Sequence, residues 1–323
     1  MDKLKFAFYW TASCGGCEIA VLDIDEKILD VVAKADIVFW PVAIDIKYKD
    51  VKAFEDDYID VCFFNGSIRT SEHEEMAHLL RKKSKTLVAF GACACFGGIP
   101  GLANVSNREE IFNLVYKELP SVSNSEGVIP QTSYNAPEGE LTIPEFYNTV
   151  KALNQVVDVD YFLPGCPPTP EMIGEAAAAI FEGNLPPKGT VLAPEKALCE
   201  ECPLEIKEKK IPEIKRPYEV IPDGKRCLLE QGLICMGINT RAGCGARCIK
   251  ANMPCRGCMG PTPEVTDQGA KLVSAIASIL GVDGEEHMSD EEIEALVNQI
   301  KDPLGTFYRY SLPISLLKRK VMK

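Results

Sequence analysis

Cysteine usage is the feature that most constrains how this chain folds. Fourteen of its 323 residues are cysteine, which is well above ordinary usage but below the density of a small disulfide scaffold. Most of them are grouped, and three Cys-x-x-Cys pairs stand out: Cys14–Cys17, Cys199–Cys202 and Cys255–Cys258. An apolar content of 46% with 25% charged residues indicates a folded globular protein. The thiols must therefore be disulfides, metal ligands or buried side chains of that fold.

The cellular compartment decides among these uses, and the sequence favours the cytoplasm. The apolar run at 6–10 ends at Thr11, whereas a secretory signal needs about 7–15 apolar residues. No stretch approaches the ~18 apolar residues of a membrane span. We therefore expect a cytoplasmic protein with reduced thiols, in which grouped cysteines indicate metal binding or catalysis. The net charge of −12 argues against nucleic acid as a partner, because such binding requires a basic surface.

Residues 1–183 alternate between apolar runs of strand character and helical patterns. Strands are expected at 5–10, 36–44, 61–68, 86–90 and 161–163, and helices at 18–34, 71–83, 107–118 and 171–181. Such alternation predicts an α/β fold, a flavodoxin-like doubly wound sheet whose strands are mostly parallel.

The remaining chain changes character twice. Residues 184–223 contain seven prolines, which disfavour helix and strand and predict a linker over a surface. Residues 224–262 are rich in Gly and Cys and cannot build an apolar core alone. Residues 263–323 return to helical patterns, at 264–280 and 289–300. We therefore expect three parts: 1–183, then 184–262 as the linker with an irregular Cys-rich domain, then 263–323 as C-terminal helices.

Three of the expected strands end in loops that carry cysteine. Cys14 and Cys17 follow the first strand, Cys93 follows the strand at 86–90, and Cys166 follows the last one. Loops after parallel strands converge at the carboxyl edge of a doubly wound sheet, so these thiols form one candidate four-cysteine site. Such a set can hold an iron–sulfur cluster or zinc, act as a redox dithiol, or stay unliganded. Twelve cysteines that divide into three fours favour several iron–sulfur clusters.

Other residues with reactive side chains give weaker signals. Cys62 lies inside a strand and is expected to be a small buried hydrophobe. Cys95, two residues after Cys93, is the ambiguous ligand of the first site. Glu18 opens a helix, where the helix dipole favours an acid, and a part in proton movement is the less favoured alternative. The three histidines, at positions 73, 78 and 287, are not clustered.

Three motifs resemble those around the proximal cluster of nickel–iron hydrogenase small subunits. They are Cys14-Gly-Gly-Cys17-Glu18, Gly91-Ala-Cys93-Ala-Cys-Phe-Gly-Gly98 and Leu163-Pro-Gly-Cys166-Pro-Pro-Thr-Pro170. The resemblance implies that the proximal cluster is held by Cys14, Cys17, Cys93 and Cys166. It implies Cys93 rather than Cys95, because the family usually has Thr or another small residue at the second position.

The Cys-rich segment resembles the two-cluster part of the same family, with two departures. The family's distal cluster usually has a histidine and three cysteines, whereas the resemblance here implies four cysteines: Cys199, Cys202, Cys227 and Cys235. Many members have a medial cluster with three cysteines, whereas this chain supplies four: Cys244, Cys248, Cys255 and Cys258. The implied cofactors are three 4Fe–4S clusters. Both departures, with the missing export signal, resemble the cytoplasmic hydrogenases of methanogens.

The resemblance also implies a role and partners. In this family the small subunit relays electrons, whereas H2 is split at a nickel–iron centre in a separate large subunit, so no catalytic residue is expected here. In the F420-non-reducing type, a 2Fe–2S adaptor subunit and heterodisulfide reductase follow. The alternative is the gamma subunit of the F420-reducing type. Two further alternatives are a respiratory complex I subunit, which shares the first fold but lacks the later cysteines, and a zinc-stapled interaction protein.

Overall fold

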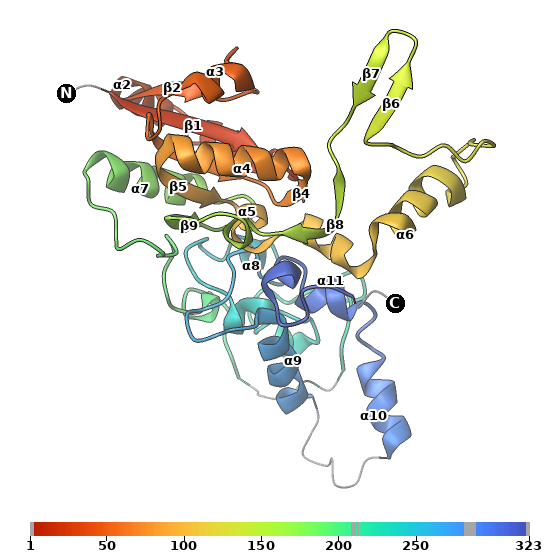
Figure 1. Cartoon of the computed structure of the whole chain (residues 1–323). Helices are drawn as coiled ribbons and strands as arrows, with labels where there is room; N and C mark the ends of the chain where they lie inside the picture. Colours follow the sequence, from red (N-terminus) through yellow and green to blue (C-terminus); the bar gives the residue numbers. More distant parts are fainter. Residues whose placement is uncertain (1–2, 208–210, 212, 281–288, 321–323) are drawn as a thin grey trace.

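A parallel β-sheet organises the first half of the chain (Figure 1). The computed structural model describes residues 3–207, 211, 213–280 and 289–320. The strands of this sheet are β1 (Leu4–Trp10), β2 (Ala35–Phe39), β3 (Ile59–Asn65), β5 (Ser84–Phe90) and β9 (Tyr161–Leu163). They are ordered β2-β1-β3-β5-β9, and neighbouring strands are parallel. This is the doubly wound order of flavodoxin-like folds, so the predicted α/β class is confirmed.

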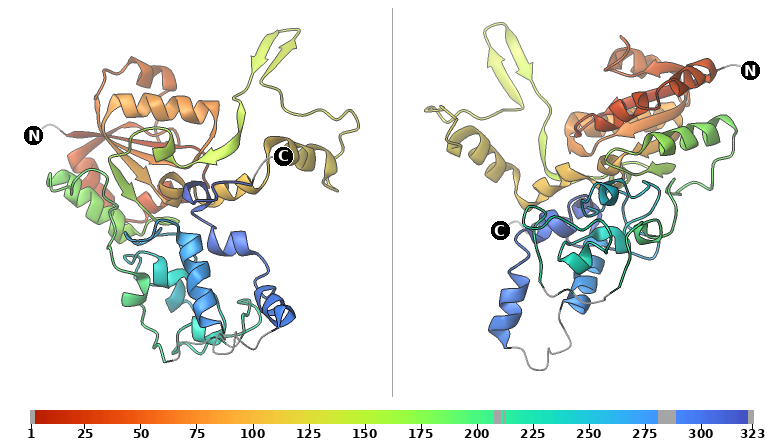
Figure 2. Two further views of the ribbon diagram at one scale, coloured as in Figure 1. Left: turned by 60° about the horizontal axis from the view of Figure 1, so that its bottom comes forward. Right: turned by 180° about the vertical axis from the view of Figure 1, so that it is seen from behind.

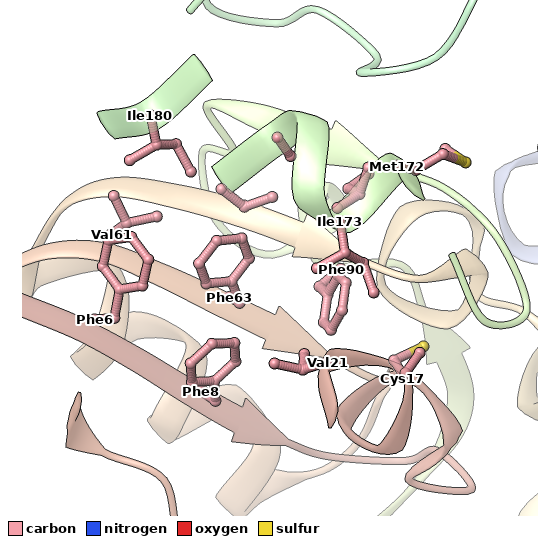
Figure 3. Close-up of a cluster of buried hydrophobic side chains, with 14 of the residues drawn as sticks. Phe6, Phe8, Cys17, Val21, Val61, Phe63, Phe90, Met172, Ile173 and Ile180 are labelled. Carbon is pink, nitrogen blue, oxygen red and sulfur yellow. The ribbon is translucent and has the colours of Figure 1, made fainter. Parts of the chain in front are cut away.

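Side chains alternate between the two faces of this sheet and form two apolar layers. Phe6, Phe8 and Phe63 lie on one face, under helices α1 (Gly16–Leu22) and α7 (Pro170–Phe181) (Figure 3). The other face is covered by α3 (Tyr48–Ala53), α4 (Ser71–Lys83) and α5 (Ala92–Phe96). A parallel sheet requires both faces to be buried, and the near-continuous apolar runs of β1, β3 and β5 supply both.

Two predicted elements are shorter in the structure. The helix expected at 18–34 is broken at Asp25, which has a left-handed conformation with φ at +56°. A new helix, α2 (Lys27–Lys34), starts after this break. The strand expected at 36–44 ends early as β2, because Pro41 has no N–H to donate to a neighbouring strand.

Two further predicted elements continue in another form. The strand expected at 61–68 is β3 followed by β4 (Ile68–Thr70), and Gly66 turns the chain between them with φ at +96°. The helix expected at 107–118 stops as α6 (Arg108–Asn113) and continues as a π-helical turn. Local periodicity located these segments but did not locate the turns inside them.

The sequence patterns did not predict the arm formed by residues 107–145 (Figures 1 and 2). After α6, the arm forms an antiparallel hairpin of β6 (Ser133–Ala136) and β7 (Gly139–Thr142). Strand β8 (Phe146–Lys151) then pairs antiparallel with β4 and returns the chain to the body. Figure 2 shows the hairpin standing clear of the remaining chain.

The Cys-rich half consists mainly of loops with short helical turns. These turns are η4 (Leu198–Glu200), η5 (Leu229–Gln231), η6 (Met236–Asn239) and α8 (Arg247–Lys250). The C-terminal helices are α9 (Gln268–Ile279), α10 (Asp290–Val297), α11 (Pro303–Phe307) and the turn η8 (Leu312–Ile314). Leu228, Leu233 and Met236 of the loops are buried against Leu272 and Phe307, so these helices supply the apolar surface that the segment lacks. Within the described ranges, no helix is long and apolar enough to cross a bilayer.

The C-terminal tail connects the two halves of the molecule. The N–H of Gly98 donates to the carbonyl of Tyr310 at 3.0 Å, and the N–H of Lys320 donates to the carbonyl of Asn104 at 2.9 Å. A Cβ on Gly101, in the turn η1 (Ile99–Val105), would lie 2.5 Å from the ring of Pro313. The tail therefore packs directly on the loop that follows Cys93. A second 3-10 turn, η3 (Leu153–Gln155), precedes β9.

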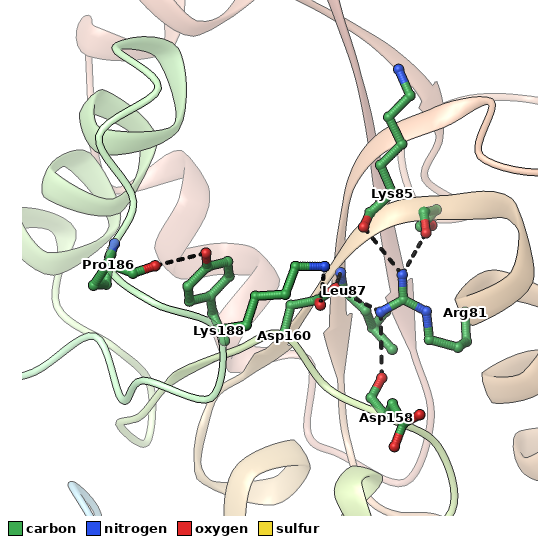
Figure 4. A network of polar contacts seen from close by, with 9 residues as sticks. Arg81, Lys85, Leu87, Asp158, Asp160, Pro186 and Lys188 are labelled. Atoms are coloured by element: carbon green, nitrogen blue, oxygen red, sulfur yellow. Dashed lines mark hydrogen bonds and ion pairs between the residues drawn. The ribbon is translucent and has the colours of Figure 1, made fainter.

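An ion-pair network fixes β9 to helix α4 and to the Pro-rich linker (Figure 4). Asp160 accepts hydrogen bonds from Arg81 Nη1 at 2.6 Å and from the N–H of Leu87 at 2.8 Å. The Nζ of Lys188 lies 2.7 Å from its other carboxylate oxygen. Because Lys188 belongs to the linker, Asp160 holds the start of that linker against the edge of the sheet.

Candidate metal centres

The loops after β1, β5 and β9 bring four thiols together at the carboxyl edge of the sheet. Burial, with the nearby thiols of Cys166 and Cys14, raises the pKa of Cys93 to about 12. Burial also raises the pKa of Cys17, and Cys93, Cys166 and Cys14 add to the shift. Cys14 and Cys166 therefore lie near both Cys17 and Cys93. The four cysteines expected from the sequence form one group, which we call the first thiol group.

Two glycines beside the first thiol group leave room for its sulfur atoms. A Cβ on Gly91 would lie 2.3 Å from the Sγ of Cys17, and a Cβ on Gly98 would lie 2.5 Å from the Sγ of Cys93. Both glycines have positive φ, +85° and +57°, a conformation that L side chains rarely adopt. The N–H of Ala92 also donates to the carbonyl of Gly165 at 2.7 Å, which joins the second loop to the third.

Cys95 lies beside the first thiol group but is directed into an apolar layer. Burial raises its pKa well above the ordinary value, and Cys17 and Cys93 add to that shift. Its Sγ donates a hydrogen bond to the carbonyl of Ala89 at 3.3 Å, and its side chain lies in the layer under α4 and α5. Cys62 lies in the same layer with no exposed surface, and burial raises its pKa to about 12. The expectation that Cys62 is a buried small hydrophobe is therefore confirmed.

A second thiol group consists of Cys199, Cys202, Cys227 and Cys235. Burial raises the pKa of Cys199 to about 12, and the thiols of Cys235, Cys227 and Cys202 add to that shift. A Cβ on Gly237 would lie 3.4 Å from the Sγ of Cys199 and 3.7 Å from that of Cys235. The loops around η4, η5 and η6 thus place the expected four cysteines together.

A third thiol group, Cys244, Cys248, Cys255 and Cys258, lies between the other two. Burial raises the pKa of Cys258 to about 12, with contributions from Cys166 of the first group and then from Cys244 and Cys248. Burial raises the pKa of Cys255 strongly, with contributions from Cys235 of the second group and from Cys258. The N–H of Cys255 donates to the Sγ of Cys235 at 3.3 Å. The three groups are therefore contiguous, in the order first, third, second.

Two residues that sequence reasoning missed support these groups. The carboxylate of Glu201 accepts hydrogen bonds from the N–H groups of Gly243 at 3.1 Å and Ala246 at 3.2 Å, which fixes the loop of the third group to that of the second. The hydroxyl of Tyr310 donates to the thiol of Cys166 and lowers its pKa against the larger effect of burial. The sequence offered a signal for Glu201, because this residue stands between Cys199 and Cys202. It offered no signal for Tyr310, since only folding brings the C-terminal tail to Cys166.

Of the other ionisable candidates, His73 has a structural contact in the described part of the chain. The Nδ1 of His73 accepts from the N–H of Arg69 at 3.3 Å, and burial lowers the pKa of this histidine to about 4. Burial raises the pKa of Glu18 to about 7, against a lowering contact with Trp40. His287 lies outside the described residues. No three His, Cys, Asp or Glu side chains of the described residues gather tightly enough to hold a single metal ion.

The donor sets fit iron–sulfur clusters. Each group offers four thiols, which are the usual ligands of 4Fe–4S clusters. Glycines stand where a Cβ would meet a cysteine sulfur in the first group, and Gly237 lies beside the second. Backbone N–H groups that approach the sulfurs, such as the N–H of Cys255, also favour the charged form of a ligand.

Comparisons with known proteins identify the family to which this chain belongs. The family model described as NADH ubiquinone oxidoreductase, 20 Kd subunit, matches residues 14–180. The chain is 42% identical over 328 residues to an iron–sulfur subunit of the F420-non-reducing hydrogenase of Archaeoglobus profundus, covering 99% of each chain. This chain belongs to the nickel–iron hydrogenase small-subunit family. It is also 40% identical to the corresponding F420-non-reducing hydrogenase subunit of Methanothermobacter thermautotrophicus, over 100% of this chain and 98% of that one.

Solved hydrogenases share the fold of this small-subunit family member. The NAD+-reducing nickel–iron hydrogenase in its H2-reduced state matches with a TM-score of 0.50 and 28% identity, over 57% of this chain and 94% of that chain. The nickel–iron–selenium hydrogenase of Dm. baculatum matches with a TM-score of 0.50 and 17% identity, over 82% and 96%. The resemblance read from the three motifs is thus confirmed. The complex I alternative is weaker, because that family model ends before the Cys-rich half.

Proposed function

We propose that this chain relays electrons from H2 oxidation in a nickel–iron large subunit to an acceptor subunit. Three 4Fe–4S clusters would carry the electrons one at a time. The proposed ligands are Cys14, Cys17, Cys93 and Cys166 for the proximal cluster, Cys244, Cys248, Cys255 and Cys258 for the medial cluster, and Cys199, Cys202, Cys227 and Cys235 for the distal cluster. The observation that carries the proposal is the contiguity of the three thiol groups, through Cys166 beside Cys258 and Cys255 beside Cys235.

The protein's part in this function is to bind, separate and shield the clusters. Four thiolates saturate each cluster, and a relay needs no open coordination position. Cys17, Cys93, Cys235 and Cys255 are buried, whereas Cys14, Cys166 and Cys248 are exposed, so the chain shields each site on one side. No residue of this chain is proposed to be catalytic, since H2 is split in the large subunit.

The relatives favour a particular acceptor. Those with 42% and 40% identity are named as subunits of F420-non-reducing hydrogenases. We propose the corresponding route for this chain, in the cytoplasm, through a 2Fe–2S adaptor subunit to heterodisulfide reductase. The gamma subunit of the F420-reducing hydrogenase is the rival, and the two differ in the protein that accepts the electrons.

Anaerobic co-expression with the large subunit and the adaptor tests this function. This chain should account for about 12 iron and about 12 sulfide of the purified complex, from three four-iron clusters. The complex should reduce methyl viologen with H2, should not reduce coenzyme F420, and should retain the 2Fe–2S adaptor. Stoichiometric zinc without absorption by iron–sulfur clusters would contradict the relay. A co-purifying flavin subunit and rapid F420 reduction would support the rival instead.

A further inference from the structure

A cavity of about 30 Å3 lies where the Pro-rich linker, the Cys-rich loops and the C-terminal helices meet. About 10–15 Å3 of such space holds one water molecule, so this cavity has room for roughly two waters or for the oxygens of one small ion. No cysteine lines it, and it is therefore separate from the three thiol groups. Its walls come from residues 214–217, 233–234, 254, 256, 299–301 and 306.

The charged side chains that line this cavity are all basic. They are Lys215, Arg216, Arg256 and Lys301. Lys215 has an acidic partner outside the cavity, since its Nζ lies 2.5 Å from the carboxylate of Glu213. In the part of the chain that the structure describes, the side chains of the other three form no ion pair. Positive charge is thus concentrated around one cavity, in a chain whose net charge is −12.

The arginines of this cavity repel one another in a partly buried place. Arg216 and Arg256 are both half-buried. Burial lowers the pKa of Arg256, and Arg309 and Arg216 lower it further, so these charges are close together. A guanidinium keeps its proton in proteins, and the repulsion is therefore relieved by a counter-ion rather than by loss of a proton. Because a desolvated charge without a partner is costly, the cavity favours an anion.

The hydrogen-bonding groups of the wall suit the oxygens of such an anion. The Oε1 of Gln299 accepts a hydrogen bond from the N–H of Ile214 at 2.7 Å, which leaves the Nε2 of this amide as a donor. The carboxylate of Glu219 accepts from the backbone N–H of Arg216 at 2.6 Å, and Glu219 does not line the cavity. A guanidinium presents parallel N–H donors that match phosphate and carboxylate oxygens. The wall therefore offers donors and positive charge to a small oxyanion.

The cavity lies beside the junction of the second and third thiol groups. Ile234 of its wall precedes Cys235 of the second group, and Arg256 follows Cys255 of the third. The thiol of Cys235 acts to raise the pKa of Arg256 against the larger effect of burial, so the guanidinium and this thiol are near each other. Cys235 and Cys255 are buried, and salt screens buried charges less than exposed ones. A charge in the cavity therefore acts on the second thiol group.

We infer that this cavity binds one small oxyanion, of the size and charge of phosphate, through Arg216, Arg256 and Lys301, and that the bound anion opposes reduction of the cluster proposed for the second thiol group. The binding is independent of the proposed function, whereas the coupling rests on it. Reduction adds one negative charge beside the cavity, so an anion already bound there makes that step less favourable. Because such coupling is reciprocal, reduction weakens anion binding by the same factor.

Equilibrium dialysis of the co-expressed complex against radiolabelled inorganic phosphate tests the site. The ionic strength is held constant with a bulky organic sulfonate, which is too large for the cavity. Arg216→Gln with Lys301→Gln should weaken binding at this site at least about tenfold, so that the variant complex binds one phosphate fewer per chain than the wild type. Equal binding by the two complexes would overturn the inference.

Two further variants make this comparison specific. The matched control, Lys196→Gln with Lys271→Gln, removes two exposed lysines that do not line the cavity, and it should bind phosphate as the wild type does. Lys301→Gln alone changes an exposed side chain and should still weaken binding in a complex with the full iron content. Phosphate binding that appears only after the acceptor subunit is removed would place a carboxylate of that subunit in the cavity, and would overturn a site for a free anion.

Redox titration followed by EPR tests the coupling. The reduced complex should bind phosphate at least about fivefold more weakly than the oxidised complex, so saturating phosphate should lower the potential of the second-group cluster by about 40 mV for one electron. The potential of the first-group cluster should change less, because the third group lies between. Equal phosphate affinity in the two redox states would overturn the coupling. A wild-type complex without iron would instead contradict the proposed function, and dialysis would still decide the anion site.

Discussion

The thiol of Cys95 donates a hydrogen bond to the carbonyl of Ala89, 3.3 Å away. This contact directs it into the apolar layer, although Cys17 and Cys93 lie near enough to add to the burial that raises its pKa. On an α-helix, residues two positions apart point to nearly opposite sides. Cys93 lies beside Cys14 and Cys166, whereas Cys95 lies in the layer under the sheet. The geometry of α5 therefore favours Cys93 as the ligand.

Serine at position 93 and alanine at position 95 should have different effects on the metal content. Cys93→Ser should remove the proximal cluster, so that iron falls from about 12 to about 8 per chain. Cys95→Ala should keep all the iron and cost about 1–2 kcal/mol of unfolding free energy, because it leaves a small cavity. Iron analysis and denaturant unfolding measure the two outcomes. The reverse pattern of iron loss would assign Cys95 as the ligand.

The glycines around the first thiol group should not tolerate a methyl group. Gly91→Ala would put a Cβ 2.3 Å from the Sγ of Cys17, in a backbone with φ at +85°. We expect loss of the proximal cluster signal in the EPR spectrum. Gly174→Ala is the control, since nothing lies within 4 Å of its Cβ, and removal of a glycine from helix α7 should stabilise the chain by about 1 kcal/mol. A Gly91→Ala protein with all three clusters would refute the close-packed arrangement.

The sheet was predictable because short stretches of the sequence specify each of its strands. Each of its strands is an apolar run, helices separate most of these runs, and topological rules then favour parallel pairing. The grouping of the cysteines was also predictable, since the loops after parallel strands converge at one edge of the sheet. Within the first half, the structure brings together the thiols that follow three strands, whereas the choice of Cys93 over Cys95 came from the family resemblance.

The parts that were missed depend on long-range contacts or on turns. The break at Asp25 needs a left-handed residue that periodicity does not reveal. The hairpin of the arm has a turn signal at Pro137 and Gly139, but its strands are only four residues each. Tyr310 reaches Cys166 from more than a hundred residues away, so only the packed tail reveals its role.

The network around Asp160 should make stability depend on acid. Burial acts to raise the pKa of Asp160, but hydrogen bonds from Lys188, Arg81 and the N–H of Leu87 hold it below the ordinary value. A lowered pKa means that the stabilisation is complete above the unfolded value of about 3.9 and disappears as the pH falls through the folded value.

Asp160→Asn should therefore destabilise the chain most at neutral pH. We expect a loss of about 2–4 kcal/mol at pH 7, to which the exposed Lys188 contributes little. The difference from the wild type should shrink below pH 4 in denaturant unfolding. Lys85→Ala, which removes an exposed ion pair with Asp60, is the control and should cost less than about 1 kcal/mol. A difference independent of pH would mean that packing, and not charge, accounts for the role of Asp160.

Proline at position 248 should convert the medial cluster into a three-iron cluster. Cys248 is exposed and is the second residue of α8, where a helix N–H has no acceptor within the helix and proline is tolerated. Arg247 beside it forms an ion pair with Glu171 of α7 at 2.7 Å, which keeps α8 in place.

The medial conversion should therefore occur without unfolding. Iron should fall from about 12 to about 11 per chain, and the oxidised protein should gain the EPR signal of a three-iron cluster. Cys62→Ala changes a buried thiol that belongs to none of the three thiol groups, so it should leave the EPR spectrum unchanged. An unchanged spectrum in Cys248→Pro would show that Cys248 is not a ligand, and the medial cluster would then need another fourth donor. The nearby carboxylate of Glu201, 3.9 Å from the Sγ of Cys244, is the group to test next.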